Sequence, residues 1–243
     1  MKAFLMIGQS NMAGRGDFGE VEEIRNPLCK MLRNARWQPM SEPINPDRSP
    51  FIFYHSGVGL AASFADEYAK HFGEMVGLIP CADGGTSIRE WQPNGALFAN
   101  AVAQCKLALQ YADAEIVGIL WHQGESDCDT EEHALTYYER FMTMIHALRR
   151  EIGLSDDVPV LIGELGEYLR TFQDGKLIYL DKVNETLHRI SEDLPCASFV
   201  SAKGLLPKSD GLHFNSESYR EFGKRYFKAY LSLFDKECSS YDR

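Results

Sequence analysis

Five runs of consecutive apolar residues are predicted to form buried strands. They cover residues 3–7, 75–80, 115–121, 158–165 and 197–202. A strand that is apolar at nearly every position is covered on both faces, which is typical of a parallel sheet. Between these runs the apolar residues take a helical spacing, which predicts helices over residues 59–72, 96–112, 130–151, 176–192 and 216–234.

The alternation of strands and helices predicts an α/β fold, a three-layer α/β/α sandwich around a parallel five-stranded sheet. Residues 20–50 do not fit this alternation. They have weak periodicity and contain five prolines, so we predict a long loop with a short helix at about 27–34. A short extended run is expected at 51–55.

Composition narrows the class of protein. The chain has 243 residues, 44% of them hydrophobic, with no repeat or linker, so we expect one domain over residues 1–243. The net charge of −10 and the lack of a basic run argue against nucleic acid and anionic membranes as partners. No apolar run reaches the roughly 18–20 residues needed to span a bilayer. The oligomeric state cannot be read from the sequence.

The cellular compartment is predicted from the first residues and the cysteines. The opening MKAFLMIGQSN becomes polar too soon for a signal peptide. The six cysteines are scattered without a C-x-x-C pair, which favours reduced thiols. We therefore expect a cytoplasmic protein. Secretion stays open, because a chain whose signal had been removed would look the same.

Polar residues follow most of the predicted strands. The first strand leads into GQSNMAG with Ser10, the second into CADGGTS, the third into HQGESD, and the fifth is followed one loop later by SDGLHFN. Ligands bind beyond the carboxyl ends of the strands in such a sheet. These segments are therefore expected at one edge of the molecule.

Ser10, His213 and Asp210 form a candidate catalytic triad. A serine hydroxyl is a poor nucleophile without a base, and His213 is the candidate base. Asp210 stands three residues before it in an Asp-Gly turn, a spacing that lets the carboxylate hold one imidazole nitrogen. Each feature alone is more typical of a turn or a helix cap, and the interpretation depends on their joint occurrence at strand ends.

An acyl-transfer site also needs donors for an oxyanion. Gly84 and Gly85 allow a backbone N–H to approach a substrate closely. The side-chain amide of Gln123 and the N–H of Ser10 are further candidates. A metal site at His122, Glu125, Asp127 and Cys128 is not favoured, because such close spacing within one loop rarely makes the side chains converge. We expect no metal and no cofactor.

Four segments together resemble the SGNH-hydrolase superfamily: GQSNM, ADGGTSIREW, WHQGESD and DGLHFN. They are most similar to its sialate O-acetylesterase-like and carbohydrate esterase family 6 (acetylxylan esterase) branch, over residues 3 to 234. The resemblance implies a flavodoxin-like fold and metal-independent ester hydrolysis. It also implies Ser10 as nucleophile, His213 as base and Asp210 as its orienting acid.

The resemblance leaves the remaining roles less defined. It implies an oxyanion hole made of three donors: the Ser10 N–H, a glycine N–H and the side-chain amide of Gln123. The preferred glycine is Gly85, with Gly84 as the second choice. The wider superfamily has asparagine at the position of Gln123. Gln9, Asn11, Glu125 and Trp91 are expected to bind substrate or support the site. Glu125 is also an alternative to Asp210 as the partner of His213. Trp91 is either a sugar-binding wall, together with the loop at 39–50, or a core residue.

The resulting hypothesis is a serine esterase that removes acetyl groups from carbohydrates through an acetyl-enzyme. Two alternatives stay open at this point. One is a non-catalytic carbohydrate-binding protein on the same fold, and the other is a lipase or thioesterase that acts on longer acyl chains. The sequence does not indicate which acetylated sugar is the substrate.

Overall fold

A computed structural model describes residues 1–47, 55–110 and 113–238, with side chains described up to residue 234. Its sheet has seven strands in the order β3-β2-β4-β1-β5-β6-β7. The strands are Lys2–Gly8 (β1), Cys29–Arg33 (β2), Arg36–Pro39 (β3), Val76–Pro80 (β4), Glu115–His122 (β5), Val160–Gly163 (β6) and Ala197–Val200 (β7). All neighbouring strands are parallel except the pair β2 and β3.

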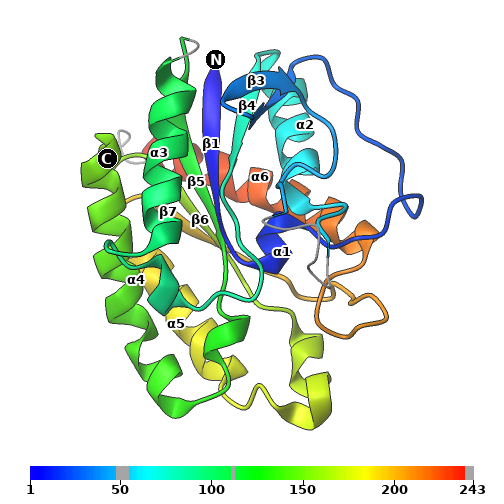
Figure 1. Ribbon diagram of the computed structural model, residues 1–243, viewed down its shortest axis with the longest axis vertical. Coiled ribbons are helices and arrows are strands. Elements are labelled where there is room, and N and C mark those ends of the chain that lie inside the picture. The colour runs from blue at the N-terminus through cyan, green and yellow to red at the C-terminus, as the bar shows by residue number, and fades with distance from the viewer. Residues whose placement is uncertain (48–54, 111–112, 239–243) are drawn as a thin grey trace.

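Helices cover both faces of this sheet (Figure 1). The α-helices are Ser10–Ala13 (α1), Leu60–Phe72 (α2), Ala96–Gln110 (α3), Glu131–Ile152 (α4), Leu180–Asp193 (α5) and Ser216–Cys238 (α6). Short 3₁₀ helices are Ile88–Trp91 (η1), Glu125–Asp127 (η2) and Glu167–Gly175 (η3). The predicted α/β/α sandwich is confirmed, and the predicted number of five strands is wrong.

The two layers of helices bury opposite faces of the same strands. In β1, Ala3, Leu5 and Ile7 pack into the core under α3, α4 and α5. Phe4 and Met6 point the other way, into the core under α2 and α6. Side chains alternate between the two faces of a strand, so a continuously apolar strand supplies both cores.

The loop predicted at 20–50 contains the additional strands. Residues 29–33, within the expected short helix, form β2 and pair with β3 in an antiparallel hairpin. The expected run at 51–55 lies almost wholly outside the described residues. Within the described part of the chain, no helix is both long enough and apolar enough to cross a membrane.

The order of the strands creates the position for a site. The chain lays β2 and β4 on one side of β1 and then places β5, β6 and β7 on the other side. A crevice forms at the carboxyl edge of a sheet where the strand order reverses in this way. The polar segments that follow β1 and β5 both lie at this crevice.

Candidate active site

Ser10 begins the short helix α1 directly after β1. Gly8 has φ +135°, and a Cβ there would lie 2.1 Å from the carbonyl oxygen of His122. Only glycine therefore allows β1 to run this close to the end of β5. The Gln9 N–H donates to the same His122 carbonyl at 2.9 Å. The chain turns at this point and holds Ser10, which is 5% exposed, at the edge of the sheet.

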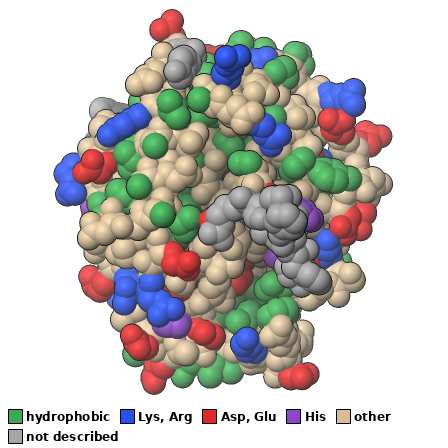
Figure 2. All heavy atoms as spheres, in the orientation of Figure 1, with side chains coloured by type: hydrophobic (Ala, Val, Ile, Leu, Met, Phe, Trp, Pro, Cys, Tyr) green, Lys and Arg blue, Asp and Glu red, His purple; other side chains and the backbone are tan. Residues whose placement is uncertain are grey.

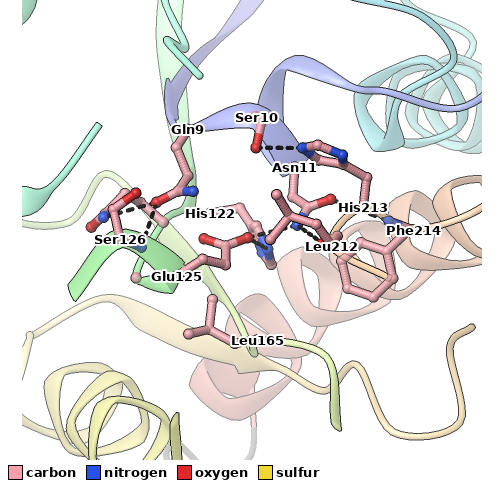
Figure 3. Close-up of polar contacts among 12 residues, drawn as sticks. Gln9, Ser10, Asn11, His122, Glu125, Ser126, Leu165, Leu212, His213 and Phe214 are labelled. Atoms are coloured by element: carbon pink, nitrogen blue, oxygen red, sulfur yellow. Dashed lines mark hydrogen bonds and ion pairs between the residues drawn. The ribbon is translucent and has the colours of Figure 1, made fainter. Parts of the chain in front are cut away.

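His213 reaches Ser10 from a loop about two hundred positions later. Its Nε2 lies 3.0 Å from the Ser10 hydroxyl, and its Nδ1 lies 2.8 Å from Oδ2 of Asp210. The other Asp210 oxygen accepts the N–H groups of Leu212 and His213, each at 2.9 Å. The structure thus brings together the three side chains predicted as a triad (Figure 3 shows the Ser10–His213 contact).

The surroundings set the charge state of this pair. Burial raises the pKa of Asp210, but hydrogen bonds from the backbone and imidazole of His213 outweigh it, so the net pKa is lowered. Burial lowers the pKa of His213, and the Arg15 charge acts in the same direction, while Asp210 opposes both. At neutral pH the arrangement is a neutral imidazole beside a carboxylate, which suits a general base.

The Ser10 hydroxyl faces a cavity of about 380 Å³. Gly84 and Gly85 also line it, and a Cβ on Gly84 would lie 3.5 Å from the Cβ of Ser10. Gly85 has φ +74°, a left-handed conformation that favours glycine. The rest of the lining combines polar side chains (Gln9, Arg15, Asn45, Asp47, Ser56, Asp83, Glu125, Ser126) with apolar ones (Pro46, Ala82, Phe172, Leu177, Leu212).

Gln123, the predicted oxyanion donor, does not reach this cavity. It is fully buried, and three acceptors lie within 3.1 Å of its Nε2, namely Gln9 Oε1, the Thr86 carbonyl and Asp127 Oδ2. An amide nitrogen has only two hydrogens, so none remains for a substrate. The Tyr137 hydroxyl donates to Gln123 from α4. We call Gln123, Thr86, Asp127 and Tyr137 the Gln123 cluster.

Gln9 lines the cavity that Gln123 does not reach. Its Oε1 accepts from Gln123 Nε2 at 3.1 Å and from the Ser126 N–H at 3.3 Å. These two donors fix the orientation of the amide, so Nε2 points away from Ser126 (Figure 3). Among the described residues no acceptor takes this Nε2, and Gln9 lines the cavity. We call Gln9, Ser10, Gly85 and His213 the cavity face.

Glu125 does not orient His213, and this alternative is wrong. Asp210 occupies the Nδ1 side of the imidazole. The Oε1 atom of Glu125 instead accepts from Asn11 Nδ2 at 2.6 Å and lies 3.5 Å from Nε2 of the buried His122. Burial raises the pKa of Glu125, but its contacts with His122 and Asn11 outweigh this, so the net pKa is lowered.

Comparison with known proteins identifies the family. Residues 1–232 match the family model described as carbohydrate esterase, sialic acid-specific acetylesterase. A probable carbohydrate esterase of Arabidopsis thaliana is 31% identical over 251 aligned positions, and the alignment covers 95% of this chain and 90% of the relative. The chain belongs to the sialic acid-specific acetylesterase family of carbohydrate esterases. Members of this family are carboxylic ester hydrolases that remove acetyl groups, and their substrates are acetylated carbohydrates.

Solved structures of other proteins share the fold. A structure of an Arabidopsis thaliana protein superposes with a TM-score of 0.83 at 30% identity and covers 95% of this chain and 98% of its own. The crystal structure of NanS superposes with a TM-score of 0.76 at 16% identity, and the match covers 96% of this chain and 97% of NanS. A carbohydrate acetylesterase from Xanthomonas citri gives 0.68 at 19% identity, covering 93% of this chain and 55% of its own.

Trp91 is a core residue of this esterase and does not form a sugar-binding wall. It is 1% exposed, packs edge-on against Trp121 and donates from Nε1 to the Thr86 hydroxyl at 3.2 Å. Of the predicted wall, only Asn45, Pro46 and Asp47 line the cavity within the described residues. Among the described residues, Phe172 of η3 places a phenyl ring on the cavity lining, and the sequence did not single it out.

Arg15 is a second cavity residue that sequence reasoning missed. It is 7% exposed, and its Nη1 donates to the Gly14 carbonyl at 2.9 Å and to Ser56 at 3.1 Å. Burial lowers its pKa, which the charges of Tyr219, Asp47 and Asp83 partly offset. Its position five residues after Ser10, in the loop that leaves the first strand, is the available sequence signal.

Of the four side chains considered for a metal site, His122 and Glu125 lie 3.5 Å apart, and the others point to separate partners. Glu125 contacts Asn11, Asp127 accepts from Gln123, and the Cys128 thiol donates to the Gly124 carbonyl. Across the ranges that the structure describes, no three histidine, cysteine, aspartate or glutamate side chains gather as metal ligands. Acidic and basic side chains are interspersed on the face shown in Figure 2, so this face has no extended basic surface for nucleic acid.

Proposed function

We propose that this protein removes acetyl groups from carbohydrates by a Ser10-His213-Asp210 mechanism with an acetyl-enzyme intermediate. The observation that carries the proposal is the chain of contacts from Ser10 Oγ through the His213 ring to Asp210, with distances of 3.0 and 2.8 Å, at the wall of a cavity. Both distances lie within the range of a nucleophile held by its base and of a base held by its orienting acid.

Acylation begins with attack of the Ser10 oxygen on the carbonyl carbon of the acetyl ester. His213 Nε2 takes the hydroxyl proton as the bond forms. Asp210 holds Nδ1–H and stabilises the imidazolium that results. The tetrahedral intermediate then collapses, the bond to the sugar oxygen breaks, and His213 returns the proton to that oxygen. The deacetylated sugar leaves, and the acetyl group stays on Ser10.

Deacylation uses the same groups in reverse. A water molecule takes the place of the sugar, and His213 removes one of its protons as the oxygen attacks the acetyl carbon. The second tetrahedral intermediate releases Ser10, which recovers its proton from His213, and acetate leaves. A neutral imidazole is needed at the start of both half-reactions, which agrees with the lowered pKa of His213.

The oxyanion is proposed to bind to Gln9 Nε2 and to the N–H groups of Ser10 and Gly85, with Gly84 as the second choice of glycine. The support for Gln9 is its orientation, because both Gln123 and Ser126 direct donors at its oxygen. The amide N–H₂ is therefore held toward the cavity before any substrate binds. A donor that is already oriented stabilises charge without reorganisation during the reaction.

The lining of the cavity is consistent with a sugar ester. The apolar side chains of Phe172, Leu177 and Leu212 offer a surface for the C–H face of a ring or an acetyl methyl group. Arg15 and Asn45 are buried polar residues on the same lining and can meet hydroxyl groups. We propose a small acetylated sugar as substrate.

Replacement of Ser10 tests the mechanism. Ser10→Ala should release acetate from acetylated sugars and from an aryl acetate at rates reduced to the background. Ser126→Ala is the matched control, since Ser126 lines the same cavity but reaches Gln9 through its backbone N–H. It should retain activity within a few-fold. If Ser10→Ala hydrolysed both substrates at the wild-type rate, the proposed mechanism would be wrong.

Two further assays separate this proposal from its rivals. A serine-reactive phosphonate should label Ser10, and a wild-type protein that neither reacts nor releases acetate would indicate a carbohydrate-binding protein. Aryl esters from acetate to octanoate should be hydrolysed with falling efficiency as the chain lengthens. An optimum at long chains would instead indicate a lipase or thioesterase.

A further inference from the structure

Asn11 contacts both residues that flank His213. Its Nδ2 lies 3.3 Å from the Leu212 carbonyl, and its Oδ1 accepts the Phe214 N–H at 3.3 Å. Asn11 also follows Ser10 directly in α1. The short helix that carries the serine is therefore bonded, through one side chain, to the loop that carries the histidine.

The orientation of the Asn11 amide is set by two partners of opposite hydrogen-bonding character. Glu125 Oε1 lies 2.6 Å from Nδ2, and a carboxylate can only accept. The Tyr219 hydroxyl donates to Oδ1, also at 2.6 Å, from α6. Asn11 and Tyr219 are fully buried and Glu125 is 3% exposed, so water does not compete for these bonds. The amide therefore has one favourable orientation.

We propose that Asn11, with its amide oriented by Glu125 and Tyr219, is a positioning residue that holds the His213 loop against Ser10. The inference rests on the proposed function, because it concerns the same serine reaction. It assigns Glu125 an indirect role, since its contact to the His213 loop runs through Asn11. A displacement of about 1 Å between reacting groups can cost roughly 100-fold in rate, so a bond at this place controls kcat.

Exchanging the hydrogen-bond donor and acceptor between Asn11 and Glu125 tests the inference. Asn11→Asp places a second carboxylate against Glu125 and removes the two N–H groups of the Asn11 amide. We therefore expect kcat on an aryl acetate to fall about 100-fold, while KM changes less than threefold. Adding Glu125→Gln to this variant supplies a side-chain N–H₂ that faces the new carboxylate. The double variant should recover about tenfold in kcat, because the Phe214 N–H keeps its acceptor at position 11, while the Leu212 carbonyl still has no donor from this side chain. Failure of the double variant to recover would contradict the proposal.

A second pair of variants covers the case in which these variants do not fold. Tyr219→Phe removes the hydroxyl that donates to Asn11, and Tyr226→Phe removes an equally buried hydroxyl on the same helix, which donates to the Trp121 carbonyl at 2.8 Å. Both should lower Tm by similar amounts. Only Tyr219→Phe should lower kcat, by about fivefold to tenfold, and shift the pH profile that reports on His213.

The outcomes separate this inference from the proposed function. If Ser10→Ala is inactive but Tyr219→Phe and Tyr226→Phe have equal kcat, the serine mechanism stands and the positioning role of Asn11 is wrong. If Ser10→Ala is as active as the wild type, the proposed function itself fails. Lower kcat in Tyr219→Phe alone, together with recovery in the double variant, supports the inference.

Discussion

The cavity face and the Gln123 cluster are made of similar groups and lie next to each other at the ends of β1 and β5. Each contains a buried glutamine close to a carboxylate or an imidazole. They differ in whether the N–H₂ group of the glutamine has acceptors within the protein. In the Gln123 cluster every amide hydrogen has an acceptor within the protein. On the cavity face no described residue accepts from the Gln9 N–H₂, and Gln9 lines the cavity.

This difference distinguishes residues with a structural role from residues expected to take part in catalysis. A satisfied polar cluster makes the structure rigid, and its removal costs mainly stability. An oriented donor without a partner can meet charge that develops on a substrate. We therefore expect substitutions on the cavity face to lower kcat and substitutions in the Gln123 cluster to lower Tm.

The largest effect is expected from the two aspartates of the comparison. Asp210→Asn keeps the shape but favours the wrong tautomer of His213, so kcat should fall about 10⁴-fold. Asp127→Asn is the matched change in the Gln123 cluster and should lower kcat less than tenfold. Steady-state kinetics on an aryl acetate measures both. Equal losses in the two variants would remove the distinction between the regions.

The next largest difference in kcat is expected between substitutions of Gln9 and of Gln123. Gln9→Met removes the proposed oxyanion donor at nearly constant volume, and kcat should fall about 100-fold to 1,000-fold. Gln123→Met removes the Gln123 donor from the Thr86 carbonyl and from Asp127, which keeps the Ile88 N–H. It should lower Tm more than Gln9→Met and lower kcat by about tenfold, through the loosened Gln9. Kinetics and thermal unfolding of both variants test this. If Gln123→Met had the larger effect on kcat, the original assignment of Gln123 would be restored.

The pH dependence should report on His213. The rate constant kcat/KM should rise as the imidazole loses its proton, and because the pKa is lowered the midpoint should lie below the usual value of about 6.5. Arg15→Gln removes one charge that lowers this pKa, so it should move the midpoint upward. Rates measured from pH 4.5 to 8.5 show both effects. A flat profile would argue against a histidine base.

The smallest effect on activity is expected at Trp91. Trp91→Phe removes a buried hydrogen bond to Thr86 and some core volume, so it should cost about 1–3 kcal/mol of stability. The value of kcat/KM on an acetylated sugar should change less than twofold, because Trp91 does not line the cavity. Denaturant unfolding and sugar kinetics make the comparison. A tenfold rise in KM for the sugar alone would place Trp91 at the substrate.

The sequence predicted the continuously apolar strands and missed β2 and β3, the last two strands on one side of the sheet. Strand β2 has charged residues at Lys30 and Arg33, which hide its alternation of buried Cys29 and Met31. Its hairpin to β3 turns through Asn34 and Ala35, both with positive φ. A two-residue hairpin usually reveals itself by glycine at such a position, and alanine does not give that signal.

The candidate triad could be predicted because topology alone brings strand ends to one edge. The sequence could not show which glutamine, Gln9 or Gln123, can offer its N–H₂ to a substrate, because each of them follows a central strand. The answer depends on Tyr137 from α4 and Asp127 from η2, which form hydrogen bonds with the Gln123 side chain. The burial of Trp91 depends in the same way on its packing against Trp121.

A crystal structure of the protein after reaction with a serine-reactive phosphonate tests the central claim most directly. The account predicts a covalent bond to Ser10 Oγ, with the phosphoryl oxygen about 2.7–3.1 Å from Gln9 Nε2 and the Gly85 N–H. Gln123 should keep its bonds to Thr86 and Asp127. An adduct on another side chain, or a phosphoryl oxygen bound by Gln123 instead of Gln9, would contradict it.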